Sequence, residues 1–213
     1  MIEQVKKHKW QLLLASILIL LPIAAGVWLW DRLPEQVATH WGTNGEPDGW
    51  SSRGFAVFGL PLLMLALNWI CLLAEQKNFK QNPKPMWLVF WICPAIALIG
   101  SAVTYGYALG VAIKMRVLAG ALLGVVFILM GNYLPKCKHN YTLGIKLPWT
   151  YASEANWNAT HRLGGHVWVA CGVGMLLTLL LPEKLAFGAM LALALAACVI
   201  PAVYSYLYSR RNG

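Results

Sequence analysis

The chain has 213 residues, of which 59% are hydrophobic and 12% are charged, and its formal net charge is +9. An ordinary soluble domain has about 25% charged residues, so this composition excludes a soluble enzyme or a nucleic-acid-binding domain as the first expectation. In membrane proteins Lys and Arg concentrate at the cytoplasmic ends of spans. The basic charge therefore predicts contact with membrane lipids and no direct nucleic acid binding.

Six segments reach or approach the length of about 20 apolar residues that a membrane-spanning helix needs. They are residues 10–30, 55–74, 87–107, 117–134, 163–181 and 185–208. The fifth is the least regular, because its continuous apolar run begins only at Val167, and a turn at 182–184 links it to the sixth. Backbone groups in lipid must be satisfied within the segment, so we predict an all-α polytopic integral membrane protein with six transmembrane helices.

The first segment follows three lysines and can be a retained span or a secretory signal. Its apolar run continues to Trp30, which exceeds the roughly 7–15 residues of a cleaved signal and favours a retained span. With the N-terminus inside, 12 of the 17 Lys and Arg residues fall in the inner segments 1–9, 75–86, 131–162 and 209–213. This bias predicts cytoplasmic N and C termini in a multi-pass membrane protein.

The predicted outer loop, residues 31–54, carries four of the eight acidic residues of the chain. Asn44-Gly45 and Asp48-Gly49 both fit turns that need a positive φ, so we predict a structured loop, which can be a structural turn, recognise a ligand or partner, or hold a metal. Its candidate residues are Pro34, His40, Asn44, Glu46 and Asp48. His40, Glu46 and Asp48 are also the candidates for a metal site, although their spacing matches no known calcium loop. No cofactor is predicted.

The predicted inner loop, residues 131–162, is the longest connection between two spans. Pro135 is expected to end the fourth span, because proline cannot continue a helix. Ser153 can cap a short interfacial helix that has Glu154 in its first turn. The loop is therefore predicted to be partly helical and to lie at the membrane surface.

Polar and aromatic residues of this inner loop form the second set of candidates. Trp157 and His161 share one face of the predicted short helix, and His161 and Arg162 can contact lipid phosphate, pair with an acid or bind a cytoplasmic protein. No nucleophile motif and no second metal ligand accompany His161, so no catalytic residue is assigned. The candidates for partner or lipid contact are Asn132, Pro135, Asn140, Trp149, Trp157, His161 and Arg162.

Ionisable residues are missing from the middle of all six predicted spans. Transporters and pumps place such groups at mid-bilayer, so their absence argues against both classes. Asn68 is interpreted as a partner in an interhelical hydrogen bond, and Gly106-x-x-x-Gly110 and Gly120-x-x-x-Gly124 predict close helix packing. The five cysteines include no CxxC pair that would indicate a zinc or redox site.

The motifs in the two loops resemble a known family. LPEQV at 33–37, HW at 40–41 and NGEPDG at 44–49 are similar to the short N-terminal domain of unknown function that begins SdpI-type membrane proteins. In the second half, the resemblance to the signature of the SdpI family is carried by GNYLP at 131–135, NY at 140–141, GIK at 144–146, PWT at 148–150 and THRLGG at 160–165.

The resemblance implies a membrane immunity protein that gives resistance to a secreted antimicrobial peptide toxin. It also implies signalling, in which the inner loop holds a cytoplasmic transcriptional repressor and the outer loop faces the toxin. Two modules follow from it, residues 1–80 with two helices and residues 81–213 with four. The alternative is a membrane enzyme or metal-dependent protein that acts at the bilayer interface through the acids and histidines of either loop.

Overall fold

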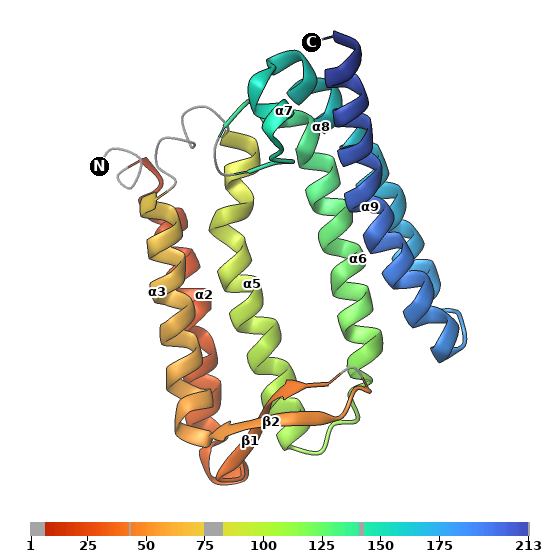
Figure 1. Ribbon diagram of the computed structural model, residues 1–213. Coiled ribbons are helices and arrows are strands. Elements are labelled where there is room, and N and C mark those ends of the chain that lie inside the picture. Colours follow the sequence, from red (N-terminus) through yellow and green to blue (C-terminus); the bar gives the residue numbers. More distant parts are fainter. Residues whose placement is uncertain (1–6, 43, 75–82, 141–142, 213) are drawn as a thin grey trace. The chain divides into compact units, whose positions relative to one another are not determined.

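The computed structural model of the protein describes residues 7–42, 44–74, 83–140 and 143–212. The described chain is mostly helical (Figure 1). It divides into two compact units, Met1–Arg116 and Val117–Gly213, and each is described by itself. The boundary between sequence modules at residue 80 is a separate division, and it stays a prediction.

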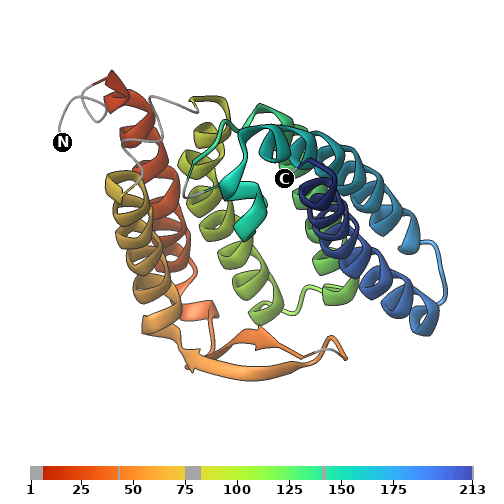
Figure 2. The ribbon, with the colours of Figure 1, turned by 45° about the horizontal axis from the view of Figure 1, so that its top comes forward.

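The first unit is a three-helix bundle with a β-hairpin at one end (Figures 1 and 2). Its elements are α2 (Lys9–Trp28), the 3-10 turn η1 (Trp30–Arg32), β1 (Gln36–Trp41), β2 (Pro47–Ser52), the π-helical segment η2 (Phe55–Gly59), α3 (Leu60–Ala74) and α5 (Pro83–Ala108). The strands pair antiparallel, with Gln36 opposite Ser52 and a register irregularity next to His40. The hairpin joins the end of α2 to the segment that leads into α3.

Among the described residues of the first unit, apolar clusters lie at two levels of the bundle. One contains Ile19 of α2 with Cys93 and Ala97 of α5. The second lies at the hairpin end, where the Tyr105 hydroxyl donates a hydrogen bond to the Pro22 carbonyl oxygen at 3.2 Å. The hairpin end of the bundle is therefore fixed by a buried hydrogen bond as well as by apolar packing.

The second unit consists of α6 (Met115–Tyr133), the 3-10 turn η3 (Leu134–Lys136), α7 (Pro148–Ala152), α8 (Glu154–Thr178) and α9 (Glu183–Asn212). Figures 1 and 2 show α8 and α9 side by side as an antiparallel pair. As expected, α6 ends just before Pro135. Ser153 caps α8 as predicted, because its side chain accepts a hydrogen bond from the Asn156 backbone N–H.

Glycines bring the backbones of α6 and α8 into contact. A methyl group on Gly124 would lie 2.9 Å from the Gly172 carbonyl oxygen, and one on Gly131 would lie 2.8 Å from the Gly165 carbonyl oxygen. Neither position has room for a side chain unless the helices separate. The predicted close packing at Gly124 is confirmed, and it extends along most of α6.

Among the residues that the structure describes, five helices are long and apolar enough to cross a membrane: Lys9–Trp28, Phe55–Ala74, Phe90–Ala108, Met115–Lys136 and Leu185–Asn212. Large apolar side chains remain exposed along them, such as Leu13, Ile17 and Leu21 on α2. A contiguous exposed apolar surface of this kind marks contact with another apolar phase, and on helices of this length that phase is lipid. The protein is a helical, multi-pass membrane protein, and the sixth span stays a prediction.

The outer loop is folded, but its secondary structure differs from the expected turns. Gly45 has the predicted positive φ, at 81°. Asp48-Gly49 is not a turn, because both residues lie within strand β2. Glycine fits there for another reason, since a side chain on Gly49 would lie 2.8 Å from the Cβ atom of His40 on the facing strand. The all-α prediction must therefore be amended by one two-stranded hairpin.

The secondary structure predicted for the inner loop and the fifth span is wrong at α8. The short interfacial helix and the fifth span, predicted as separate elements, are one continuous helix of 25 residues. The connection to α9 spans residues 179–182 rather than 182–184. The first turns of α8 are polar, so hydropathy does not show that they continue into the apolar segment. These polar side chains can be buried because they form hydrogen bonds within the unit.

Gly110 was expected to support helix packing and instead ends α5. Its φ is +83°, and nothing lies within 4 Å of the position of a side chain there. The Val111 N–H donates to the Gly106 carbonyl oxygen, and the Gly110 N–H donates to the Tyr107 carbonyl oxygen. This pair of bonds is a Schellman motif, in which glycine adopts the left-handed conformation just after the helix.

Candidate functional site

Arg53 ties the hairpin to the end of α2. Its guanidinium donates hydrogen bonds to the carbonyl oxygens of Trp30 and Leu33 at 2.7 and 3.0 Å, and it lies 4.4 Å from the centroid of the Trp30 ring. A planar guanidinium with five donors can serve both carbonyls and the ring face at once. No sequence pattern singled out Arg53, and its place directly before the second apolar segment is the available signal.

The other end of the hairpin is held against α5 and the segment that follows it. The Trp41 ring meets the Tyr107 ring edge-on, with centroids 5.8 Å apart. The Arg116 guanidinium donates a hydrogen bond to the Asn44 carbonyl oxygen at 3.3 Å. Contacts at both ends make the hairpin a docked part of the first unit, so its outward side chains are presented from a fixed platform.

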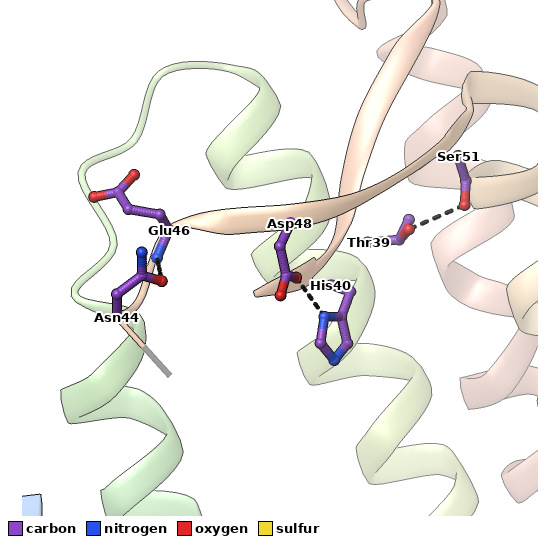
Figure 3. Close-up of polar contacts among 6 residues, drawn as sticks. All are labelled: Thr39, His40, Asn44, Glu46, Asp48 and Ser51. Atoms are coloured by element: carbon purple, nitrogen blue, oxygen red, sulfur yellow. Dashed lines mark hydrogen bonds and ion pairs between the residues drawn. The ribbon is translucent and has the colours of Figure 1, made fainter. Parts of the chain in front are cut away.

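Two hydrogen bonds join side chains of β1 to side chains of β2 in this hairpin (Figure 3). His40 Nδ1 and Asp48 Oδ1 are 2.5 Å apart, and both side chains are exposed. Next to them, Thr39 Oγ1 and Ser51 Oγ form a hydrogen bond of 3.0 Å. The two strands thus bring together His40 and Asp48, which are eight residues apart in the sequence.

The other predicted residues of the outer loop do not join this pair. Asn44 Oδ1 accepts a hydrogen bond from the Glu46 backbone N–H at 3.1 Å, and Figure 3 shows the Glu46 carboxylate directed away from His40 and Asp48. Pro34 is exposed between η1 and β1. Across the described parts of the chain, no group of three or more His, Cys, Asp or Glu residues is arranged to hold a metal ion.

In the second unit, His161 anchors the loop that precedes α7. The His161 ring is 1% exposed and stacks on Trp157 with centroids 4.0 Å apart. Its Nδ1 lies 2.8 Å from the Trp157 carbonyl oxygen, and its Nε2 accepts a hydrogen bond from the Ile145 N–H at 2.9 Å. An N–H at Nδ1 leaves Nε2 as the acceptor, so the ring is neutral. Burial lowers the pKa of His161 to about 4.

The loop is shaped to fit this ring. Gly144 has a φ of 126°, and a side chain at this position would overlap His161 Nε2. Asn140 is buried and folds the loop onto itself, because its amide nitrogen donates to the Lys138 and Leu143 carbonyl oxygens and its oxygen accepts from the Leu143 N–H. Trp157 donates from its indole nitrogen to the Cys137 carbonyl oxygen at 2.9 Å. Tyr141, part of the predicted motif, lies outside the described residues.

A buried polar network that was not predicted from the sequence joins α8 to α9. The Asn156 amide nitrogen donates to the Ser205 carbonyl oxygen at 2.9 Å, and its oxygen accepts from the Thr160 and Ser205 hydroxyls at 2.8 and 3.0 Å. Asn156 and Thr160 are four residues apart, which places them on one face of a helix. That spacing was the available signal, but Ser205 is too distant in sequence to be paired with them.

Burial divides the predicted inner-loop residues into two groups. Trp157 and His161 are almost fully buried, and in this structure their rings stabilise the loop from inside the unit. Arg162 is exposed, as are Pro135 and Asn132, and the Asn132 amide nitrogen donates to the Ile128 carbonyl oxygen of its own helix. Trp149 is half-buried, and its ring packs edge-on against Tyr206 of α9.

Both the hairpin and the His161 loop lie in regions that match known protein families. Residues 17–65, which contain the hairpin, match a domain of unknown function (DUF1648). Residues 136–209, which contain the His161 loop, match the SdpI/YfhL protein family. The protein named Immunity protein SdpI from Bacillus subtilis (strain 168) is 24% identical over 202 residues, which cover 94% of this chain and 97% of that protein. No solved structure matches. Residues 136–209 therefore form an SdpI/YfhL family domain, and the similarity to an SdpI protein extends over nearly the whole chain.

Proposed function

We propose that the protein is an immunity protein of the bacterial cytoplasmic membrane that gives resistance to a secreted antimicrobial peptide. The supporting observation is the similarity to Immunity protein SdpI over 94% of the chain. The matched regions include the hairpin and the His161 loop. Similarity between apolar spans alone would support only a membrane location, because any two lipid-facing helices have similar composition.

In the proposed topology the chain crosses the membrane six times and both termini are cytoplasmic. The apolar part of α8, from residue 163 onward, supplies the sixth crossing. The excess of Lys and Arg in the proposed inner segments supports this orientation. It places the hairpin outside, where a secreted peptide arrives, and the His161 loop inside.

The chemistry of the hairpin suits a cationic peptide. Four acids and two arginines give residues 31–53 a net charge of −2 in a chain whose total is +9. The Glu46 and Asp48 side chains are exposed on a docked platform, and acidic surface groups raise the local concentration of a cationic ligand. We propose Pro34, His40, Asn44, Glu46 and Asp48 as the recognition residues.

Signalling through a cytoplasmic repressor is the second part of the proposal. Asn132, Pro135 and Arg162 are exposed around the His161 loop and would form its contact surface. A peptide bound outside can affect this surface only if it binds one arrangement of the helices more tightly than another. Such coupling would be visible as a change in repressor binding when the peptide is added.

Survival of a sensitive bacterium tests the resistance function. Cells that express the protein are challenged with a panel of secreted cationic peptides, and we expect protection against at least one. A Glu46→Gln, Asp48→Asn double variant should lose much of this protection. The matched control is Asp31→Asn with Glu35→Gln, which removes the same charge from the same loop. Absence of protection by the unaltered protein across the panel would refute the proposal.

Labelling of single cysteines tests the topology. On a background without native cysteines, Glu46→Cys should react with a membrane-impermeant maleimide in intact cells. Leu181→Cys, in the connection between α8 and α9, should react too if α8 crosses the membrane. Lys146→Cys should react only after permeabilisation. Reaction of Lys146→Cys in intact cells would contradict the proposed orientation.

A further inference from the structure

A pocket of about 420 Å³ in the second unit carries a further function, and we propose that it binds the phosphate group of an anionic lipid headgroup. Its polar lining comes from Asn158 and Arg162 of α8 and from Tyr204 and Tyr208 of α9, with Pro135 at one side. The volume lies in the range of about 300–1,000 Å³ that is typical of ligand pockets. The proposal does not depend on peptide resistance.

The lining has the chemistry of a phosphate site. The Arg162 guanidinium offers five N–H donors, the two tyrosines offer hydroxyls and Asn158 offers an amide. Arg binds phosphate through paired, charge-assisted hydrogen bonds. No acidic side chain lines the pocket. Within the described parts of the chain, Arg162 makes no ion pair, so its charge is available to an anion from outside the protein.

Helical spacing aligns these donors in two facing rows. Asn158 and Arg162 are four residues apart on α8, and Tyr204 and Tyr208 are four residues apart on α9, so each pair lies on one face of its helix. On a different face of α8, the bonds from Asn156 to Ser205 hold the two helices together. The pocket therefore has a fixed width, which a defined ligand requires.

The pocket lies near the ends of the helices, which favours a lipid headgroup at the membrane surface over a ligand bound at the middle of the spans. Pro135 lies in the η3 turn that follows α6, Arg162 directly precedes the apolar part of α8, and Tyr208 is followed by Arg210 and Arg211 in the last turn of α9. All three positions mark the change from apolar span to polar end. Tyrosines and basic residues at this level favour the headgroup region, and basic pockets between helix ends bind anionic headgroups.

Lipid binding to the purified full-length protein tests this site. The protein is held in a non-ionic detergent and titrated with phosphatidylglycerol, and the bound lipid is counted by native mass spectrometry. We expect one tightly bound lipid, and Arg162→Gln should weaken its binding by about tenfold. The matched control is Arg211→Gln, which removes the same charge from the same end of the unit outside the pocket, and it should change binding by less than about twofold.

Further variants and ligands make the test decisive. Tyr208→Phe keeps the ring and removes one hydroxyl, so a drop of about threefold is expected even if Arg162→Gln folds poorly. Diacylglycerol, which lacks phosphate, should not bind at this site. Equal weakening by Arg162→Gln and Arg211→Gln would overturn the proposal, because it would mean a diffuse charge effect. Displacement of the lipid by inorganic phosphate at equal concentration would assign the site to a soluble phosphate and overturn the lipid assignment.

Discussion

Replacement of His161 by alanine should release the loop that precedes α7. The change leaves the half-buried Ile145 N–H without its acceptor, at a cost in the range of about 1–3 kcal/mol. It also removes the stack on Trp157, which contributes about 0.5–1.5 kcal/mol. The sum is about 3 kcal/mol, so the population of the open loop should rise by about a hundredfold.

Cys137 provides the readout for loop opening. This cysteine is buried next to the loop, and burial raises the pKa of its thiol to about 11, so it should react slowly with a maleimide while the loop is closed. The assay uses a chain in which alanine replaces the other four cysteines, Cys71, Cys93, Cys171 and Cys198. The labelling rate of Cys137 then reports the open fraction.

His166 supplies a matched control, since it is an exposed histidine on the same helix. His166→Ala should label at the rate of the unaltered protein, whereas His161→Ala should label about a hundredfold faster. Equal rates for the two variants would refute the role of His161 as the anchor of the loop. A faster rate in both would mean that α8 itself had been weakened.

The same anchor makes the closed loop sensitive to acid. The pKa of His161 is about 4 when the loop is closed and should return to about 6.5 when the ring is exposed. The open state therefore binds more protons between these values, and the stability of the closed loop falls as the pH falls through this window. From pH 7 to pH 5 the loss is about 2 kcal/mol. Labelling, normalised to the unfolded chain at each pH, should accelerate accordingly in the unaltered protein and not in His161→Ala.

Three further substitutions test the packing. Gly172→Ala should lower the unfolding free energy by about 2 kcal/mol, because its methyl group would lie 2.6 Å from the Gly124 carbonyl oxygen, whereas Gly188→Ala, with open space around it, should be neutral or stabilising in the same thermal unfolding assay. Arg53→Gln should make the hairpin more sensitive to limited proteolysis, and Arg32→Gln, at an exposed site of the same loop, should not. Asn156→Ala should cost about 2 kcal/mol by leaving two buried hydroxyls without an acceptor, and Asn156→Asp should recover part of it.

Hydropathy predicted five of the helices because lipid imposes a simple rule on composition. Each such segment has to be apolar over its whole length, and that property is local in sequence. The same rule does not describe α8, since Asn156 and Thr160 are buried in its first turns, where Thr160 is bonded to Asn156 and Asn156 is bonded to Ser205 of α9. The partner of Asn156 is 49 residues away in the chain, and no local pattern contains that information.

In the hairpin, too, the contacts between side chains could not be predicted from the local sequence. The density of turn-forming residues correctly indicated a folded loop, and Gly45 adopts the predicted conformation. The pairing of His40 with Asp48 depends on the register of β1 against β2, and an irregularity next to His40 sets that register. Candidate residues could be named from the sequence, but which of them meet could not.

The motif at residues 160–162 shows why candidates in a motif need to be separated by structure before they are tested. Successive residues of a helix point in directions about 100° apart, so three neighbours cannot all face one ligand. Thr160 and His161 are directed into the unit and are fully bonded there, whereas Arg162 is exposed at the pocket. A substitution at His161 therefore reports first on the folding of the loop. Loss of function in Arg162→Gln, with the Cys137 labelling rate unchanged, would report on ligand binding alone.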